Sequence, residues 1–326
     1  MGITTSTPMY TIEDVPGKGK GLVAAKDIPK GTRILTEEPI IRVEPPIGSM
    51  KHLEACISEQ VISLSDQQSQ DFISLANIYP YSTPSEQWRG IFRTNALPTG
   101  PLLDTGGVFL TASRINHGCD NNTAHFWNEN LQKLTIHAVR DIPHGEELTI
   151  FYLSSRRNRD ARREELQQNF KFTCTCTLCS LPPEQCKDSD AKLDRVHAID
   201  LIIEQRGERG LVQKPRQMLH YVHEQVLLWS SPLPNNVGLT RAYPDAFQVA
   251  IANGDLARAK VFAERVVALY LISLGADSPD VLEYRRLALD PASHDYYGMS
   301  MKWKTGVGEV PRGMGTEEFE KWLWRK

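Results

Sequence analysis

The stretch ASRINHGCDNN, from Ala112 to Asn122, sets an amide, an imidazole and a thiol close together near the middle of the chain. Asn116 and His117 offer hydrogen-bond donors and acceptors at adjacent positions, and Cys119 follows two residues later. An Asn-His pair on its own more often belongs to a satisfied structural network than to a site. The function of this stretch therefore depends on the motifs that accompany it.

The segment FKFTCTCTLC, residues 170–179, carries three cysteines in the pattern C-x-C-x-x-C. A tetrahedral zinc ion takes four ligands, and thiolates at this spacing can hold one side of it. Cys186 lies close in sequence and Cys119 lies in the stretch described above, so both are candidates for the fourth ligand. The alternative is an exposed turn without a metal, although such a reactive cluster is a liability in a cell.

The composition is that of a globular protein. Among 326 residues, 40% are hydrophobic and 24% are charged, and the net charge of −3 argues against direct nucleic-acid binding. We find no leader and no apolar run of membrane length, so we expect no membrane span and a reducing compartment, where clustered cysteines hold metals. The start MGITTS fits a myristoylation pattern through Gly2 and Ser6, but so short a pattern often arises by chance.

The first half of the chain alternates between strand and helix signals. Short β-rich runs cut by Gly/Pro turns predict strands within residues 10–44, and apolar residues spaced three or four apart predict helix over residues 50–88. Strand signals return in GIFRTNAL, residues 90–97, and continue to ELTIFY, residues 147–152. The alternation of Leu134, Ile136 and Ala138 predicts a strand with one buried face.

The second half has a different composition. SLPPEQCKDSD, residues 180–190, is typical of a linker, and helical patterns follow it. Leu193, Val196, Ile199 and Ile203 share one helical face, and Gly207 ends that pattern. Residues 243–275 predict a helical hairpin that turns at Asn-Gly-Asp.

Two further motifs are weak when taken singly. GKGKGL, residues 17–22, is a glycine-rich turn that allows the backbone to approach a ligand, but no βαβ unit surrounds it. GEELTIFY, residues 145–152, ends a strand with Tyr152, and an aromatic residue at a strand end usually belongs to a core.

The order of these four motifs resembles that of the SET-domain lysine methyltransferases. GKGKGLVAAKDIPKGTRI is similar to the opening G-x-G segment, and RINHGCDNN resembles R-x-N-H-S-C-x-P-N. GEELTIFY resembles the closing G-E-E-L-T-x-x-Y, and CTCTLC resembles the post-SET C-x-C-x-x-C. The helical insertion and the helical second half look most like the SMYD branch and its fungal relatives, without the MYND finger.

The resemblance implies an α+β protein with a β-rich SET core, followed by an α-helical C-terminal domain. The implied boundaries are a SET domain over residues 9–180, with a helical insertion at about 46–90 and a post-SET zinc segment at 170–180. A linker over 181–191 and a helical domain over 192–326 would follow. We expect this helical domain to form one wall of the substrate cleft.

The resemblance also implies the chemistry, which is methyl transfer from S-adenosyl-L-methionine to lysine side chains of a histone or non-histone protein. It makes Tyr152 the catalytic residue and Zn²⁺ the metal. The implied cofactor-binding residues are Lys18, Gly19, Lys20, Gly21, Asn95, Asn116, His117 and Phe172, the last as the aromatic that stacks on adenine. The implied zinc ligands are Cys119, Cys174, Cys176 and Cys179.

The sequence departs from the family pattern at three positions. Gly118 stands where Ser is usual, Asn121 where Pro is usual, and Phe151 where many members have Asp. These changes support an alternative, a catalytically weak or inactive SET-fold module that binds a protein partner. A second alternative is a methyltransferase that acts on something other than protein lysine. For the favoured enzyme we expect a protein substrate, a monomer, and a location in the nucleus, the cytoplasm or both.

Overall fold

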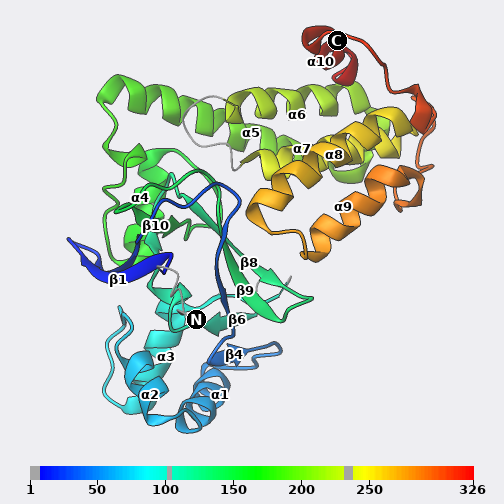
Figure 1. The fold of residues 1–326 in the computed structure, drawn as a ribbon. Coiled ribbons are helices and arrows are strands. Elements are labelled where there is room, and N and C mark those ends of the chain that lie inside the picture. Colours follow the sequence, from blue (N-terminus) through cyan, green and yellow to red (C-terminus); the bar gives the residue numbers. More distant parts are fainter. Residues whose placement is uncertain (1–7, 101–104, 231–237) are drawn as a thin grey trace, which may run out of the picture. The chain divides into compact units, whose positions relative to one another are not determined.

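The computed structural model describes residues 8–100, 105–230 and 238–326 (Figure 1). The myristoylation pattern at Gly2 and Ser6 lies outside these residues. The chain divides into two compact units. Unit 1 comprises Met1–Leu153, Arg163–Cys174 and Ile272–Ser278, and unit 2 comprises Ser154–Arg162, Thr175–Leu271 and Pro279–Lys326.

Unit 1 contains the strands, as the sequence predicts. Within the described residues they form three sheets, with the orders β1-β2-β10-β7, β3-β9-β8 and β4-β6-β5. The strands are β1 (Tyr10–Val15), β2 (Gly19–Ala24), β3 (Arg33–Glu37), β4 (Ile41–Val43), β5 (Leu97–Pro98), β6 (Gly106–Val108), β7 (Asn116–His117), β8 (Thr123–Asn128), β9 (Lys133–Ala138) and β10 (Glu147–Ile150). Leu22, Leu134 and Ile150 belong to one buried apolar cluster, whereas Ile41, Val43 and Val108 of β4 and β6 belong to a second one.

The parallel pairing of β7 with β10 brings two distant motifs together. Thr149 pairs with Asn116 and Ile150 pairs with His117, and the Gly118 N–H donates to the Ile150 carbonyl at 3.0 Å. The register places the residues after β10 beside the Asn-His pair, although more than 30 residues separate them along the chain.

The helical insertion consists of α1 (Met50–Ile62), α2 (Asp66–Ile73) and α3 (Pro84–Asn95) (Figure 1). Capping boxes at Ser65 and Thr83 set the starts of α2 and α3. The strand predicted for GIFRTNAL is wrong, because α3 continues to Asn95 and β5 begins only at Leu97. Ile91 and Phe92 are buried on the helical face that packs in the insertion core, and this tertiary packing overrides the strand signal.

Strand β9 is buried on both faces, so the prediction of a single buried face is wrong. His137, only 1% exposed, accepts a hydrogen bond at its Nε2 from the Arg33 Nε–H at 3.1 Å. The Arg33 guanidinium also donates to Asp277, which belongs to the segment Ile272–Ser278 of unit 1. This segment arrives from far along the chain, and the local alternation of β9 contains no signal of it.

The burial of His137 predicts a pH-dependent stability. Burial and the neighbouring Arg33 charge lower the pKa of His137 from 6.5 to about 4. Between these values the unfolded chain takes up a proton that the folded site resists, so the free energy of unfolding falls as the pH is lowered from about 6.5 to about 4. The loss for this residue is roughly 3 kcal/mol at most. Urea unfolding of wild type and His137→Gln at several pH values measures it, and we expect a smaller pH slope in the variant. Identical slopes would contradict this assignment.

Unit 2 is helical. It contains α5 (Pro183–Gln213), α6 (Pro215–Trp229), α7 (Leu239–Ala252), α9 (Pro279–Leu289) and α10 (Thr316–Leu323). Two helices are shared between the units. Helix α8 (Leu256–Ser273) belongs to unit 2 as far as Leu271, and α4 (Arg159–Phe170) begins in unit 2 and ends in unit 1. Helices α7 and α8 confirm the predicted hairpin that turns at Asn-Gly-Asp. Gly207 interrupts α5 with a φ of 46°, as its predicted role as a stop requires.

The predicted linker over residues 181–191 is wrong for most of its length, because α5 begins at Pro183. Cys186, Ser189 and Leu193 are buried at spacings of three and four residues, which continue into the apolar face at Val196 and Ile199. Proline at the first helical position is favourable, because its missing N–H would have no partner within the helix.

Candidate active site and metal centre

Tyr152 follows β10 by two residues and is held by its hydroxyl and by its backbone. The hydroxyl donates to the Ile115 carbonyl at 2.7 Å, and the backbone N–H donates to Nδ1 of His117 at 3.1 Å. The Tyr152 ring packs against the ring of Phe170, with centroids 5.0 Å apart. Burial raises the pKa of Tyr152 well above its usual value, and the charge of Glu147 raises it further, so the hydroxyl stays protonated at neutral pH.

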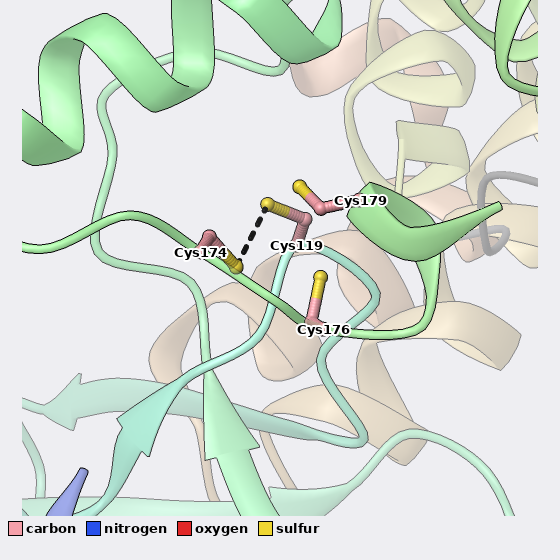
Figure 2. A group of neighbouring side chains, drawn as sticks. All are labelled: Cys119, Cys174, Cys176 and Cys179. Atoms are coloured by element: carbon pink, nitrogen blue, oxygen red, sulfur yellow. Dashed lines mark hydrogen bonds between the residues drawn. The ribbon is translucent and has the colours of Figure 1, made fainter. Parts of the chain in front are cut away.

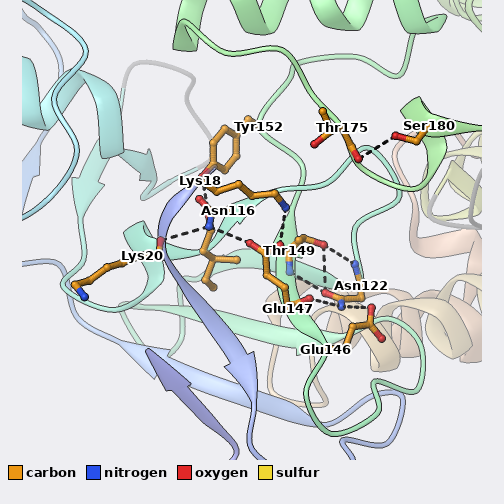
Figure 3. A network of polar contacts seen from close by, with 11 residues as sticks. Lys18, Lys20, Asn116, Asn122, Glu146, Glu147, Thr149, Tyr152, Thr175 and Ser180 are labelled. Atoms are coloured by element: carbon orange, nitrogen blue, oxygen red, sulfur yellow. Dashed lines mark hydrogen bonds and ion pairs between the residues drawn. The ribbon is translucent and has the colours of Figure 1, made fainter. Parts of the chain in front are cut away.

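Asn116 lies at the centre of a polar network (Figure 3). Its Nδ2 donates to Glu147 Oε1 at 2.9 Å and to the Lys20 carbonyl at 3.3 Å. Glu147 also forms an ion pair with Lys18, at 2.5 Å between Oε2 and Nζ. The network therefore joins the glycine-rich turn to Asn116. It adds Glu147, which sequence reasoning missed although the residue lies within GEELTIFY.

The glycine-rich turn is shaped so that larger residues do not fit at one position. A Cβ at Gly21 would lie 2.7 Å from Asn116 Nδ2 and 2.7 Å from Val15 Cγ2. Gly17 and Gly19 have φ angles of 74° and 72°, a region that favours glycine. The turn therefore presents backbone beside the ion pair of Lys18 with Glu147.

The other two predicted cofactor residues have different surroundings. Phe172 lies near His117, with ring centroids 6.2 Å apart. Asn95, 8% exposed, donates from Nδ2 to the carbonyls of Ala76 and Ile91, both at 2.7 Å. The backbone carbonyl of Asn95 accepts a hydrogen bond from Ser113 Oγ. In the described residues no hydrogen bond joins the Asn95 side chain to Asn116. The side-chain amide of Asn95 instead donates to backbone carbonyls of the helical insertion.

Four cysteine sulfurs gather at one place (Figure 2). The Sγ atoms of Cys119, Cys174, Cys176 and Cys179 all lie within 4.8 Å of one another, and those of Cys119 and Cys174 are 3.9 Å apart. A tetrahedral zinc ion with Zn–S distances of about 2.3 Å separates its sulfurs by about 3.8 Å, so these residues fit Zn²⁺. Cys186 is not part of the group, and its thiol donates to Asp190 Oδ2 at 3.3 Å.

The cluster has polar neighbours that the sequence did not reveal. His117 Nε2 lies 3.3 Å from Cys119 Sγ, and a guanidinium nitrogen of Arg162 lies 3.6 Å from Cys179 Sγ. Both side chains are buried, with exposed fractions of 3% and 2%. Nitrogen donors of this kind neutralise part of the charge of zinc-bound thiolates.

The departures from the family pattern lie in a well-bonded turn. Asn121 Nδ2 donates to the Thr123 carbonyl at 2.8 Å, and the neighbouring Asn122 accepts from the Thr149 N–H at the same distance. A Cβ at Gly118 would lie 2.8 Å from Thr149 Oγ1, so glycine relieves a close approach. The Phe151 ring packs beside His117, with centroids 5.4 Å apart. These contacts hold the chain at the positions that depart from the family pattern.

Comparison with known proteins places the chain in a class. The SET domain profile matches residues 19–153, which extend from β2 to just beyond Tyr152. Together with the relatives described next, this match shows that the chain belongs to the SET-domain family of lysine methyltransferases, as its motifs predict.

Two relatives define the resemblance further. Histone-lysine N-methyltransferase set5 of Schizosaccharomyces pombe is 32% identical over 295 residues, which cover 88% of this chain and 86% of the relative. Histone-lysine N-methyltransferase SMYD3 of Mus musculus is 30% identical over 182 residues, or 53% of this chain. The chain matches only 40% of the length of SMYD3.

No helix in the described ranges is long and apolar enough to cross a membrane.

Proposed function

We propose that this protein transfers a methyl group from S-adenosylmethionine to the side-chain amine of lysine in a protein substrate. The observation that carries the proposal is the parallel pairing of β7 with β10. It sets Tyr152 beside His117 and Glu147 beside Asn116, so that residues of two motifs form one site.

The proposed cofactor site uses the residues around the glycine-rich turn. Lys18 and Glu147 suit the carboxylate and ammonium of a zwitterion, while Gly21 leaves room beside Asn116. Backbone groups of Gly19, Lys20 and His117 and the ring of Phe172 complete the proposed set, and Asn95 would contribute through its effect on Ser113. S-adenosylmethionine supplies an electrophilic methyl on a sulfonium, and it leaves as S-adenosylhomocysteine once the N–C bond has formed and the C–S bond has broken.

The protein must present the lysine as a neutral amine. A free lysine side chain has a pKa of about 10.4, so at neutral pH it carries a proton that must be lost before attack. Aromatic side chains of Phe170 and Tyr152 offer an apolar surface, and removal from water favours the neutral amine. Because the Tyr152 hydroxyl is itself protonated and donates to the Ile115 carbonyl, its proposed role is to hold its oxygen beside the transferring methyl and orient the reacting groups rather than to act as a base.

The metal proposal is one Zn²⁺ held by Cys119, Cys174, Cys176 and Cys179. Bound zinc would tie residues 174–179 to the turn that carries Asn116 and His117. The domain boundaries from the sequence also stay a proposal, except that residues 183–191 belong to α5 rather than to a linker.

The names of the relatives support a proposal for the substrate class. Both relatives described above are named histone-lysine N-methyltransferases, so a lysine on a histone is the first substrate to test. A location in the nucleus, the cytoplasm or both agrees with such a substrate.

Replacing Asn116 by Ala should weaken S-adenosylmethionine binding by about 1–3 kcal/mol, because Glu147 and the Lys20 carbonyl would lose a donor at the site. Titration calorimetry of wild type and variant measures the difference. Asn130→Ala is a matched control, since this exposed amide contacts the Asp277 carbonyl. Equal affinity in wild type and Asn116→Ala would refute the assigned cofactor site.

The same titration separates the alternative function. A SET-fold module that only binds a partner need not bind S-adenosylmethionine at all, whereas the proposed enzyme must do so. Absence of binding to folded wild-type protein would favour the interaction module.

A further inference from the structure

His117 contacts two groups with different roles through its two ring nitrogens. Nδ1 accepts the backbone N–H of Tyr152 at 3.1 Å, and Nε2 lies 3.3 Å from Cys119 Sγ. The ring is buried and packs near Phe151 and Phe172, which restrict its rotation. The imidazole therefore lies between the candidate catalytic residue and one sulfur of the cysteine cluster.

The two contacts fix where the ring carries its proton. A nitrogen that accepts a hydrogen bond has a free lone pair, so Nδ1 is unprotonated. A neutral imidazole then has its proton on Nε2, which faces Cys119 Sγ and can donate to it. A thiolate that ligates zinc is a good acceptor for such a donor, and outer contacts of this kind orient the ligand.

We propose that the His117 imidazole is a positioning residue that links metal ligation at Cys119 to the backbone position of Tyr152. The consequence of this link for catalysis rests on the proposed function, whereas the two contacts of His117 do not. Metal binding sets the direction of the Cys119 sulfur, the sulfur holds Nε2–H, and the ring then holds the Tyr152 N–H. Loss of the metal should therefore lower the protection of the Tyr152 backbone amide more than that of amides elsewhere in the unit.

Two substitutions separate the contacts. The amide of Asn occupies a position close to that of Nδ1, so His117→Asn can still accept from Tyr152 but cannot reach Cys119. The longer Gln side chain brings its amide near the position of Nε2, so His117→Gln can still donate to the sulfur. Arg162→Lys is the matched control, because Arg162 contacts a different sulfur, that of Cys179.

The first measurement is Zn²⁺ affinity, by competition with a chromophoric chelator. We expect His117→Asn to bind Zn²⁺ about 10–100-fold more weakly than wild type, the usual effect of losing an outer contact to a ligand, and His117→Gln to keep most of the affinity. Unchanged affinity in His117→Asn would overturn the contact with Cys119.

The second measurement is hydrogen exchange at the Tyr152 amide, followed by NMR with and without Zn²⁺. The reference is the Ile28 amide, which donates to the Ile142 carbonyl at 2.8 Å in the same unit. In wild type, removal of Zn²⁺ should lower protection at Tyr152 more than at Ile28. In His117→Asn the same removal should change Tyr152 much less, whereas Arg162→Lys should respond like wild type.

The link is overturned if Tyr152 and Ile28 lose protection equally on removal of Zn²⁺, because general loosening would then explain the effect. It is also overturned if His117→Asn responds like wild type. Neither measurement uses turnover, so a protein that failed to transfer methyl groups would refute the proposed function without refuting the link.

Discussion

Tyr152→Phe will lower kcat for protein methylation by about 10²–10³-fold, the usual effect of removing one preorganised polar group aimed at the charge that develops in the transition state. The hydroxyl donates to the Ile115 carbonyl at 2.7 Å, while the ring packs against Phe170 and His117. Only the hydroxyl is lost in the variant, so the ring contacts persist. We therefore expect S-adenosylmethionine affinity to stay near the wild-type value, because the loss is one of transition-state stabilisation.

The variant needs a control for the loss of a phenolic hydroxyl in general. Tyr79→Phe serves, because Tyr79 lies in the helical insertion, where Arg93 stacks over its ring at 4.3 Å. Calorimetry should show both variants bound to S-adenosylmethionine, and single-turnover kinetics should show only Tyr152→Phe slowed. A kcat within threefold of wild type would remove Tyr152 from the chemistry.

Purified protein should contain close to one zinc per chain, and Cys119→Ser should lose most of it. Structural zinc sites contribute folding free energy of about 10–16 kcal/mol in small peptides, so loss of one ligand should also lower the melting temperature strongly. Elemental analysis measures the zinc content, and calorimetry measures the melting temperature. The prediction is informative because Cys119 is 55 residues from Cys174 along the chain.

Cys186→Ser is the matched control for the metal. Cys186 is buried and close in sequence to the cluster, but its thiol donates to Asp190 and Cys186 is not one of the four clustered cysteines. It should keep the full zinc content. Zinc loss in Cys186→Ser with retention in Cys119→Ser would reverse the ligand assignment, and protein without zinc would rule out the metal proposal.

The parts of the site that the sequence predicted are those in which a motif fixes both residue type and local backbone. The order of four motifs was sufficient to place Cys119 with the three clustered cysteines, whereas the contact of Asn116 with the glycine-rich turn is visible only in the structure. Glu147 was not predicted, because a carboxylate in a turn-and-strand segment is common. Only the β7–β10 register shows that Glu147 faces Asn116.

The errors in the fold arose where distant segments decide the local structure. The strand signal of Ile91 and Phe92 was overridden by packing within the insertion, and proline and charge in residues 180–190 concealed the buried face that begins at Cys186. The burial of His137 depends on Asp277 and its segment, which lies 140 residues further along the chain. No pattern within β9 contains that information.

This result also changes how the second half of the chain can be tested. A truncation after Cys186 would cut α5 within its first turn and remove Asp277, the partner of Arg33 in unit 1. Such a protein would not report on substrate choice alone. Point substitutions on exposed faces of unit 2 test substrate choice without that loss.

The most direct test of the central claim is methyl transfer itself. Purified protein is incubated with S-adenosylmethionine carrying a labelled methyl group and with core histones or a whole-cell lysate, and the labelled residue is identified by mass spectrometry. The account predicts label on lysine Nζ of a protein, formed together with S-adenosylhomocysteine and nearly abolished by Tyr152→Phe. Label on another residue or on a non-protein molecule, or labelling of lysine that Tyr152→Phe leaves unchanged, would contradict it.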